Sequence, residues 1–237
     1  MRRARTVIIP FVILLCLAVA GVANAAELKD VVAALEQGYG ELHDLQADFA
    51  QRTTIAALKR NQKGAGELYL KRPAKASAMF RFDYTKPRQE IVSNGRTVWY
   101  YIPENRQVMT SELSAMFAGG NSIALAWLTG MGNLSRDFAV AFDGKGRDAH
   151  GNYLLDLTPK RANQGITRLQ LTIAAGAVDG YLKAGKAVMP FPIVASTVTD
   201  AMGNRTAIEF SRVKVNQGLG SGRFTFKIPK GVEVIRQ

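Results

Sequence analysis

The sequence predicts a mainly β fold of the α+β class, built on one strongly curved antiparallel sheet. Roughly a dozen short segments with strand character follow one another and are separated by turn dipeptides. One helical segment, residues 28–42, precedes them, and one apolar, glycine-rich segment, residues 111–134, interrupts them. Such a succession of hairpins is typical of an antiparallel meander and not of alternating β–α units.

The first 25 residues, MRRARTVIIPFVILLCLAVAGVANA, are predicted to be a cleaved secretory signal peptide. They combine a basic head, an apolar core and an A-x-A exit that ends at Ala25. The alternative is a retained membrane anchor, but the apolar core is short and Pro10 interrupts it. We therefore expect one exported domain, residues 26–237. The only cysteine, Cys16, lies in the signal, so the mature chain is expected to use no disulfide or thiol chemistry.

The mature chain is basic. Loss of the three arginines of the signal peptide lowers the formal net charge from +12 to +9. This charge is compatible with an anionic membrane surface, with an acidic partner, or simply with a solubilising surface. Because the Lys and Arg residues are scattered singly and the chain is predicted to be exported, we expect no nucleic-acid partner.

Residues 28–42 are predicted to form an amphipathic helix. Their apolar side chains recur at the three-and-four spacing of a single helical stripe, namely Leu28, Val31, Val32, Leu35, Tyr39 and Leu42. Gly38 and Gly40 weaken the last turn of this helix. The stripe needs an apolar surface to cover.

From Leu45 onward the apolar period changes to two, which is typical of strands. The predicted strands are residues 45–51, 66–72, 79–84, 89–93, 97–103, 107–111, 138–142, 152–159, 166–173, 192–200, 206–215 and 223–229. The predicted turns include Asn94-Gly95, Asp143-Gly144, Gly151-Asn152, Asp179-Gly180 and Gly203-Asn204. In residues 206–215, the large apolar side chains occupy even positions before Ser211 and odd positions after Arg212. This shift predicts a β-bulge and a bent sheet.

The segment 111–134 carries Leu125, Trp127 and Leu128 at helical spacing. It predicts one or two short helices joined by Gly119-Gly120. Two interpretations stay open for it. It is either a fixed plug in the core of the sheet or a movable lid with glycine hinges.

Enzyme chemistry has little support. The mature chain contains two histidines, His43 and His150, and none of the common hydrolase, metalloprotease or nucleotide-binding motifs. Asp143 and Asp148 flank a glycine-rich turn, but their spacing is not that of a calcium loop, and an ordinary surface turn is favoured. We expect no catalytic residue, no metal and no cofactor.

An apolar face is the remaining candidate for function. Leu68 and Leu70 lie on one face of their strand, and Phe80, Phe82 and Tyr84 lie on one face of the next. The position of Arg72 continues the face of Leu68 and Leu70. The face is either an ordinary closed core or the lining of a ligand cavity, and Arg72 is either a snorkelling surface residue or a buried polar anchor.

The sequence resembles the LolA family of periplasmic carriers of outer-membrane lipoproteins. The resemblance rests on the segments GELYLKRP, FRFDYTKP, IVSNGRTVWYYIP, DAMGNRTAIEF and FTFKIPKGVEVI, which occur in the order of the family between Leu28 and Ile235. It implies an unclosed β-barrel with a helical lid over an apolar cavity, a soluble monomer in the periplasm, and no enzyme activity. It also implies three partners: lipoprotein acyl chains, an inner-membrane ABC transporter that loads them, and an outer-membrane receptor lipoprotein that accepts them.

The resemblance also implies roles for individual residues. Arg72 matches the family arginine that holds the empty carrier closed by hydrogen bonds to backbone carbonyls of the lid. Phe80 matches a cavity aromatic, whereas Phe82 stands where many members have tryptophan. The expected cavity residues are Leu68, Leu70, Phe80, Phe82 and Tyr84, and the expected lid residues are Met116, Phe117, Leu125, Trp127 and Leu128. The alternative is a LolA-like carrier or sensor of another lipid or lipidated polymer.

Overall fold

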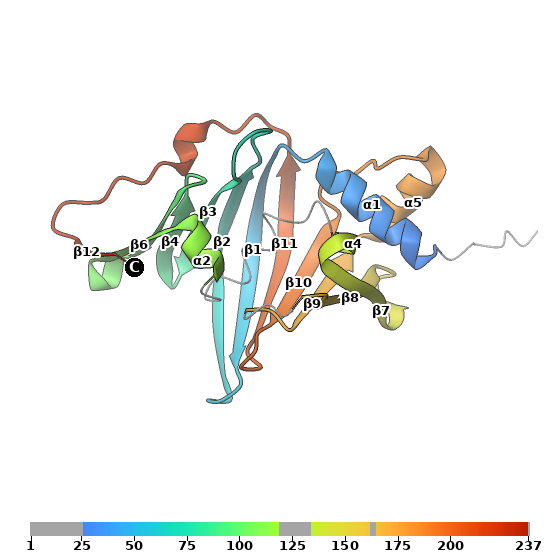
Figure 1. Ribbon diagram of the computed structural model, residues 1–237, viewed down its shortest axis with the longest axis horizontal. Helices are drawn as coiled ribbons and strands as arrows, with labels where there is room; N and C mark the ends of the chain where they lie inside the picture. The colour runs from blue at the N-terminus through green and yellow to red at the C-terminus, as the bar shows by residue number, and fades with distance from the viewer. Residues whose placement is uncertain (1–25, 119–133, 162–164, 237) are drawn as a thin grey trace, which may run out of the picture.

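The computed structural model describes residues 26–118, 134–161 and 165–236. Its centre is one twelve-stranded sheet with the order β12-β6-β5-β4-β3-β2-β1-β11-β10-β9-β8-β7 (Figure 1). Neighbouring strands pair antiparallel, except that β12 runs parallel to β6. β12 and β7 stand at the two ends of the order and the sheet does not close, so the predicted unclosed, mainly β fold is confirmed. The predicted signal peptide lies outside the described residues.

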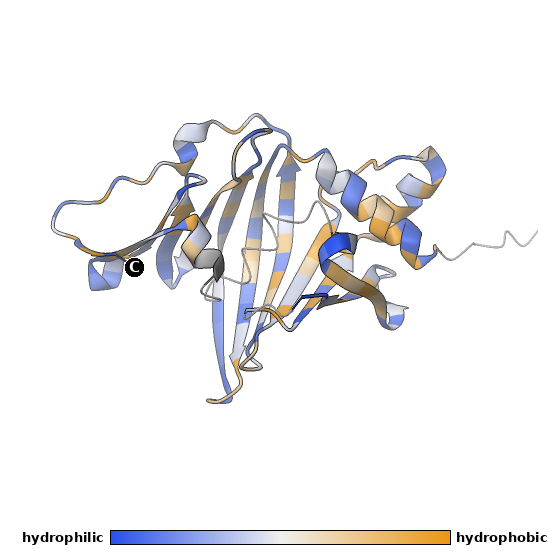
Figure 2. Cartoon of the chain, viewed as in Figure 1, coloured by the Kyte–Doolittle hydropathy of each residue, from blue (hydrophilic) through white to orange (hydrophobic). Residues whose placement is uncertain are grey.

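The strands follow the predicted series closely. They are β1 (Asp44–Ile55), β2 (Arg60–Lys71), β3 (Met79–Lys86), β4 (Arg88–Ser93), β5 (Thr97–Ile102), β6 (Gln107–Glu112), β7 (Phe138–Arg147), β8 (Tyr153–Pro159), β9 (Arg168–Ile173), β10 (Ile193–Thr199), β11 (Arg205–Val215) and β12 (Glu233–Arg236). Along β9 buried and half-buried residues alternate strictly. Figure 2 shows the same alternation as bands of apolar and polar colour along the central strands.

Helices cover one face of the sheet. They are α1 (Leu28–Gly40), α2 (Leu113–Ala118), α4 (Leu134–Asp137) and α5 (Ala175–Ala184). The described chain also forms the short 3-10 helices η1 (Pro103–Asn105) and η3 (Ser221–Phe224), which are not part of this cover. Figure 1 shows α1, α2 and α4 in front of the sheet. We call the covered face the inner face and the opposite face the outer face. Within the described ranges, no helix is both long enough and apolar enough to span a membrane.

The predicted bulge in β11 is confirmed. Gln46 pairs with Lys214 and Asp48 with Ser211, so Arg212 and Val213 together face Ala47 alone. Arg212 has a φ of 49°, and its guanidinium pairs with the Asp48 carboxylate. Because of the extra residue, Phe210 and Val215 both pack on the apolar core, although they are an odd number of positions apart along the strand.

Two predicted turns are wrong. Asp179-Gly180 lies inside α5, because the chain between β9 and β10 forms a helix and not a hairpin. A Cβ atom at position 180 would collide with the side chain of Val188, so glycine permits close packing there. Asp143-Gly144 lies within β7, where the pairing with β8 shifts register between Phe142 and Arg147.

The predicted strand 223–229 is also wrong. Its first residues belong to η3, and the rest extends without a strand partner. The alternating pattern arises because this segment lies against the outer face: Phe224 is buried, and the Phe226 ring lies 6.2 Å from Trp99 and 5.7 Å from Tyr101. The last strand is β12, whose four residues are all exposed, so its Val234 and Ile235 do not belong to an alternating buried pattern.

Candidate functional site

The five side chains predicted to line a cavity lie together on the inner face. β2 and β3 pair so that Leu68 faces Phe82 and Leu70 faces Phe80. Each of these four side chains is at most 1% exposed, and Tyr84 is half-buried. They meet Phe49 of β1, whose ring lies 5.3 Å from Phe82 and 4.8 Å from Tyr84. Sequence periodicity thus identified one contiguous apolar cluster.

The apolar surface continues across the other half of the sheet. Phe49 faces Phe210 of β11, and Leu171 of β9 faces Leu155 of β8. All of these side chains belong to one core cluster with those of β2 and β3. A single long apolar surface therefore spans the strands from β3 to β8.

Helix α1 covers part of this surface. Val31, Leu35 and Tyr39 of its apolar stripe are 0% exposed and belong to the same core cluster. The helix begins with a capping box between Glu27 and Asp30, which satisfies its first N–H groups. The N–H groups of Glu41 and Leu42 bond carbonyls of its last turn, but this turn carries no basic residue, so a cationic partner for the negative end of its dipole must come from elsewhere in the chain.

Arg72 supplies that partner. β2 ends at Lys71, and the Arg72 backbone N–H donates to the His43 carbonyl at 2.8 Å. The guanidinium donates to the carbonyl oxygen of Tyr39 and, at 3.4 Å, to that of Leu42. It also lies 4.5 Å above the centroid of the Tyr39 ring. Arg72 is therefore a polar anchor that neutralises the negative end of the α1 dipole.

The described carbonyl partners of Arg72 belong to α1 and its exit, whereas the resemblance implied carbonyls of the segment 111–134. Most of that segment, including Leu125, Trp127 and Leu128, lies outside the described residues. Met116 and Phe117 belong to α2, but their side chains also lie outside the described part. The lid residues therefore stay predictions.

A second anchor next to Arg72 was not predicted. The Asp44 carboxylate, at the start of β1, accepts N–H groups of Gln217 and Gly218 at 2.8 Å and of Leu219 at 3.1 Å. The Lys71 ammonium donates to the Leu219 carbonyl. These bonds tie the start of β1 and the end of β2 to the C-terminal segment. The signal in the sequence was weak, because an aspartate before a strand also fits an ordinary turn.

Asn216 completes this second anchor. Its side-chain oxygen accepts the His43 N–H at 2.8 Å, and its amide nitrogen donates to the Glu41 carbonyl at 2.9 Å. Asn216 has a φ of 56°, a conformation that asparagine tolerates better than most residues. The exit of α1 is thus fixed from both sides, by Arg72 and by Asn216.

Tyr39 carries an unusual polar group. Its hydroxyl is buried and has no hydrogen-bond partner within the described part of the chain. Burial raises the pKa of this phenol far above its usual value, while the Arg72 charge opposes the shift. Tyr84 differs, because its hydroxyl donates to Gln51 Oε1 at 2.8 Å. No group of three His, Cys, Asp or Glu side chains suited to a metal ion occurs among the residues that the structure describes.

These features define the class of the protein: a helix-covered, unclosed β sheet with a continuous apolar inner face. A family model described as outer membrane lipoprotein carrier protein LolA matches residues 41–183. Outer-membrane lipoprotein carrier proteins of Neisseria meningitidis serogroup B and Pseudomonas aeruginosa are each 30% identical to the chain. These alignments cover 90% and 92% of the chain and 91% and 96% of those proteins. The chain belongs to the LolA family.

A solved structure supports the fold. The crystal structure of an uncharacterized conserved protein from Thermus thermophilus is similar, with a TM-score of 0.50 and 14% sequence identity. The match covers 88% of this chain and 98% of that chain.

Proposed function

We propose that this protein is a periplasmic carrier that holds the acyl chains of lipoproteins against its inner face. The observation that carries the proposal is the long apolar surface from β3 to β8, covered by a helix that an arginine fastens at one end. The family relatives are named as carriers of outer-membrane lipoproteins, which favours this cargo. The role needs no catalytic residue.

Energetics explain why such cargo needs a carrier. Burial of one methylene group is worth about 0.8 kcal/mol, so an acyl chain of about fifteen carbons carries on the order of 12 kcal/mol of transfer free energy. Spontaneous release into water is therefore negligible. We infer that an inner-membrane ABC transporter loads the carrier and that an outer-membrane receptor lipoprotein with its own apolar site unloads it. The carrier acts as a monomer.

Loading requires a movement of the cover. Leu68, Leu70, Phe80 and Phe82 are closed to solvent, so acyl chains reach them only after a cover moves. We assign this movement to α1 and to the predicted lid, residues 111–134. Arg72 acts as the latch in this proposal. Its hydrogen bonds to the carbonyls at the end of α1, each worth about 1 to 3 kcal/mol, are given up on opening and regained on closing.

A fluorescent apolar probe tests the proposal. The purified protein should take up the probe saturably, and a triacylated lipopeptide should displace it. Arg72→Leu should fold but change probe uptake and lipopeptide release, whereas Lys75→Leu, an exposed cation in the same loop, should behave as the wild type. Lack of saturable uptake would exclude an acyl-chain site. Mass spectrometry of the copurifying cargo then separates lipoprotein from another lipid or lipidated polymer.

A further inference from the structure

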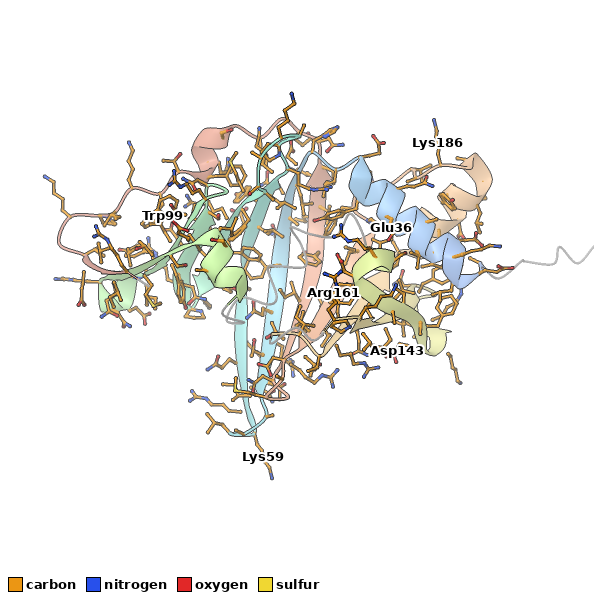
Figure 3. All side chains as sticks on the ribbon, in the orientation of Figure 1. Glu36, Lys59, Trp99, Asp143, Arg161 and Lys186 are labelled. Carbon is orange, nitrogen blue, oxygen red and sulfur yellow. The ribbon has the colours of Figure 1, made fainter. Side chains whose placement is uncertain are left out.

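Two turns form a projecting tip at the end of the sheet away from Arg72. They are the β1–β2 turn, residues 56–59, and the β10–β11 turn, residues 200–204. The Ala56 N–H donates to Asn204 Oδ1 at 3.0 Å, which fixes the two turns side by side. Figure 1 shows the β1–β2 hairpin as the lowest part of the molecule, and Figure 3 shows Lys59 at its end, pointing away from the sheet. We call residues 56–60 and 200–204 the tip.

The tip exposes apolar side chains. Leu58 is 68% exposed and Met202 is 78% exposed, more than any other large apolar side chain in the described ranges. Figure 2 shows an apolar turn at the end of hydrophilic strands. Exposure of large apolar side chains costs free energy, and these two strongly exposed side chains lie on adjoining turns, so they suggest a contact with something apolar.

Cations surround the apolar side chains. Lys59, Arg60, Lys63, Arg52 and Arg205 are all exposed, and none of them takes part in an ion pair described in the structure. Arg52 and Lys63 face each other directly across β1 and β2. Like charges at such a position destabilise a sheet, so an anion from outside the chain would relieve the repulsion.

The acid within the tip does not supply that anion. The Asp200 carboxylate accepts the N–H groups of Met202 and Asn204 at 2.9 and 2.8 Å and the Asn204 side-chain amide at 2.8 Å. Its oxygens are thus directed into their own turn. The tip presents net positive charge around two apolar side chains.

We propose that the tip docks on a bilayer that contains anionic phospholipid. Leu58 and Met202 enter the boundary between headgroups and acyl chains, and the surrounding Lys and Arg side chains contact lipid phosphates. A protein partner fits less well, because two apolar side chains on adjoining turns offer far less than the roughly 800 Å² per partner of a stable protein interface. The proposal does not rest on the identity of the cargo.

Docking by the tip leaves the inner face free. β2 runs from Arg60 at the tip to Lys71 beside the latch, and its 12 residues span roughly 40 Å. Helix α1 and Arg72 therefore lie well above the bilayer when the tip touches it. The carrier then approaches a membrane without exposing its apolar core to lipid.

Vesicle flotation tests the proposal with the purified protein. Vesicles of phosphatidylethanolamine and phosphatidylglycerol should bind it, phosphatidylcholine vesicles should bind it far less, and added salt should weaken binding. Lys59→Glu with Arg60→Glu should lower the partition coefficient at least about tenfold, and Leu58→Ser with Met202→Ser should lower it several-fold.

Matched controls lie on and beside α5 at the other end of the molecule. Lys183→Glu with Lys186→Glu removes two exposed cations, and Leu182→Ser removes an exposed leucine. Both should bind as the wild type does, and thermal unfolding should show that all variants fold. Absence of wild-type binding to anionic vesicles, equal binding to neutral ones, or equal losses in tip and control variants would overturn the proposal.

Discussion

The two ends of β1 and β2 use charged side chains in opposite ways. At the end near α1, Asp44, Lys71 and Arg72 all bond backbone groups and fasten a helix and the C-terminal segment to the sheet. At the other end, the cations of the tip make none of the ion pairs that the structure describes and point into solvent. The same residue types thus act as internal fasteners at one end and remain available to a partner at the other. Substitutions should therefore affect stability at the first end and association at the second.

Asp44→Ala should produce the largest loss of stability. It removes the acceptor of three backbone N–H groups in a site that is 4% exposed. Hydrogen bonds to a charged acceptor are worth more than neutral ones, so we expect the free energy of unfolding to fall by about 3 kcal/mol. Urea denaturation measures this. Asp200→Ala, whose carboxylate also accepts N–H groups but in a half-buried turn at the tip, should cost less, and an equal loss in both variants would show that the two ends do not differ in this respect.

Tyr39 and Tyr84 of the inner face should respond differently to loss of the hydroxyl. Tyr84→Phe breaks the bond to Gln51 and should lower the free energy of unfolding by about 1 kcal/mol. Tyr39→Phe removes a buried hydroxyl without a described partner and should leave this free energy unchanged or raise it. Denaturation of both variants side by side provides the measurement. A larger loss for Tyr39→Phe would mean that this hydroxyl has a partner in solution.

Leu58→Ser at the tip should leave the fold unaffected. The side chain is 68% exposed, so its removal should change the free energy of unfolding by less than about 0.5 kcal/mol. Val31→Ser, at a fully buried position of α1, is the contrasting change and should be strongly destabilising. Similar melting curves for these two variants would show that the tip is not free in solution.

Asp148→Asn should have the smallest effect, a slight loss of stability near neutral pH that disappears in acid. Hydrogen bonds from the Asn152 side chain, and from the backbone N–H groups of Asn152 and His150, hold the pKa of the Asp148 carboxyl below its ordinary value. Because this pKa is lower in the folded than in the unfolded state, the ionised carboxyl stabilises the fold at pH values above the unfolded-state pKa. This stability is lost as the pH falls through the folded-state pKa. The acid limb of a stability–pH curve should therefore be slightly shallower in the variant, whereas a steeper limb would contradict this sign.

Local periodicity predicted most of the sheet, because buried positions on a strand recur every second residue. The same logic failed at residues 223–229, whose alternation arises from packing on the outer face without strand pairing, and at Asp179-Gly180, where a turn-like dipeptide sits in a helix. The cluster of Leu68, Leu70, Phe80, Phe82 and Tyr84 was predictable because it lies on two adjacent strands. The hydrogen-bond partners of Arg72 and Asp44 were not predictable. They lie about 30 residues from Arg72 and about 170 residues from Asp44 in the sequence, and no local pattern encodes such contacts.

In the proposed function, α1 is a movable cover that Arg72 holds closed over the acyl-chain site. Hydrogen exchange of the amides in residues 28–40 tests it most directly, in the empty protein, in the protein loaded with a triacylated lipopeptide, and in Arg72→Leu. We predict that exchange in α1 rises about tenfold on loading and that Arg72→Leu shows a similar rise without ligand, while β1 and β2 keep their protection. Exchange in α1 that is unchanged by both loading and the substitution would show that α1 is a fixed part of the fold and not a cover held by Arg72.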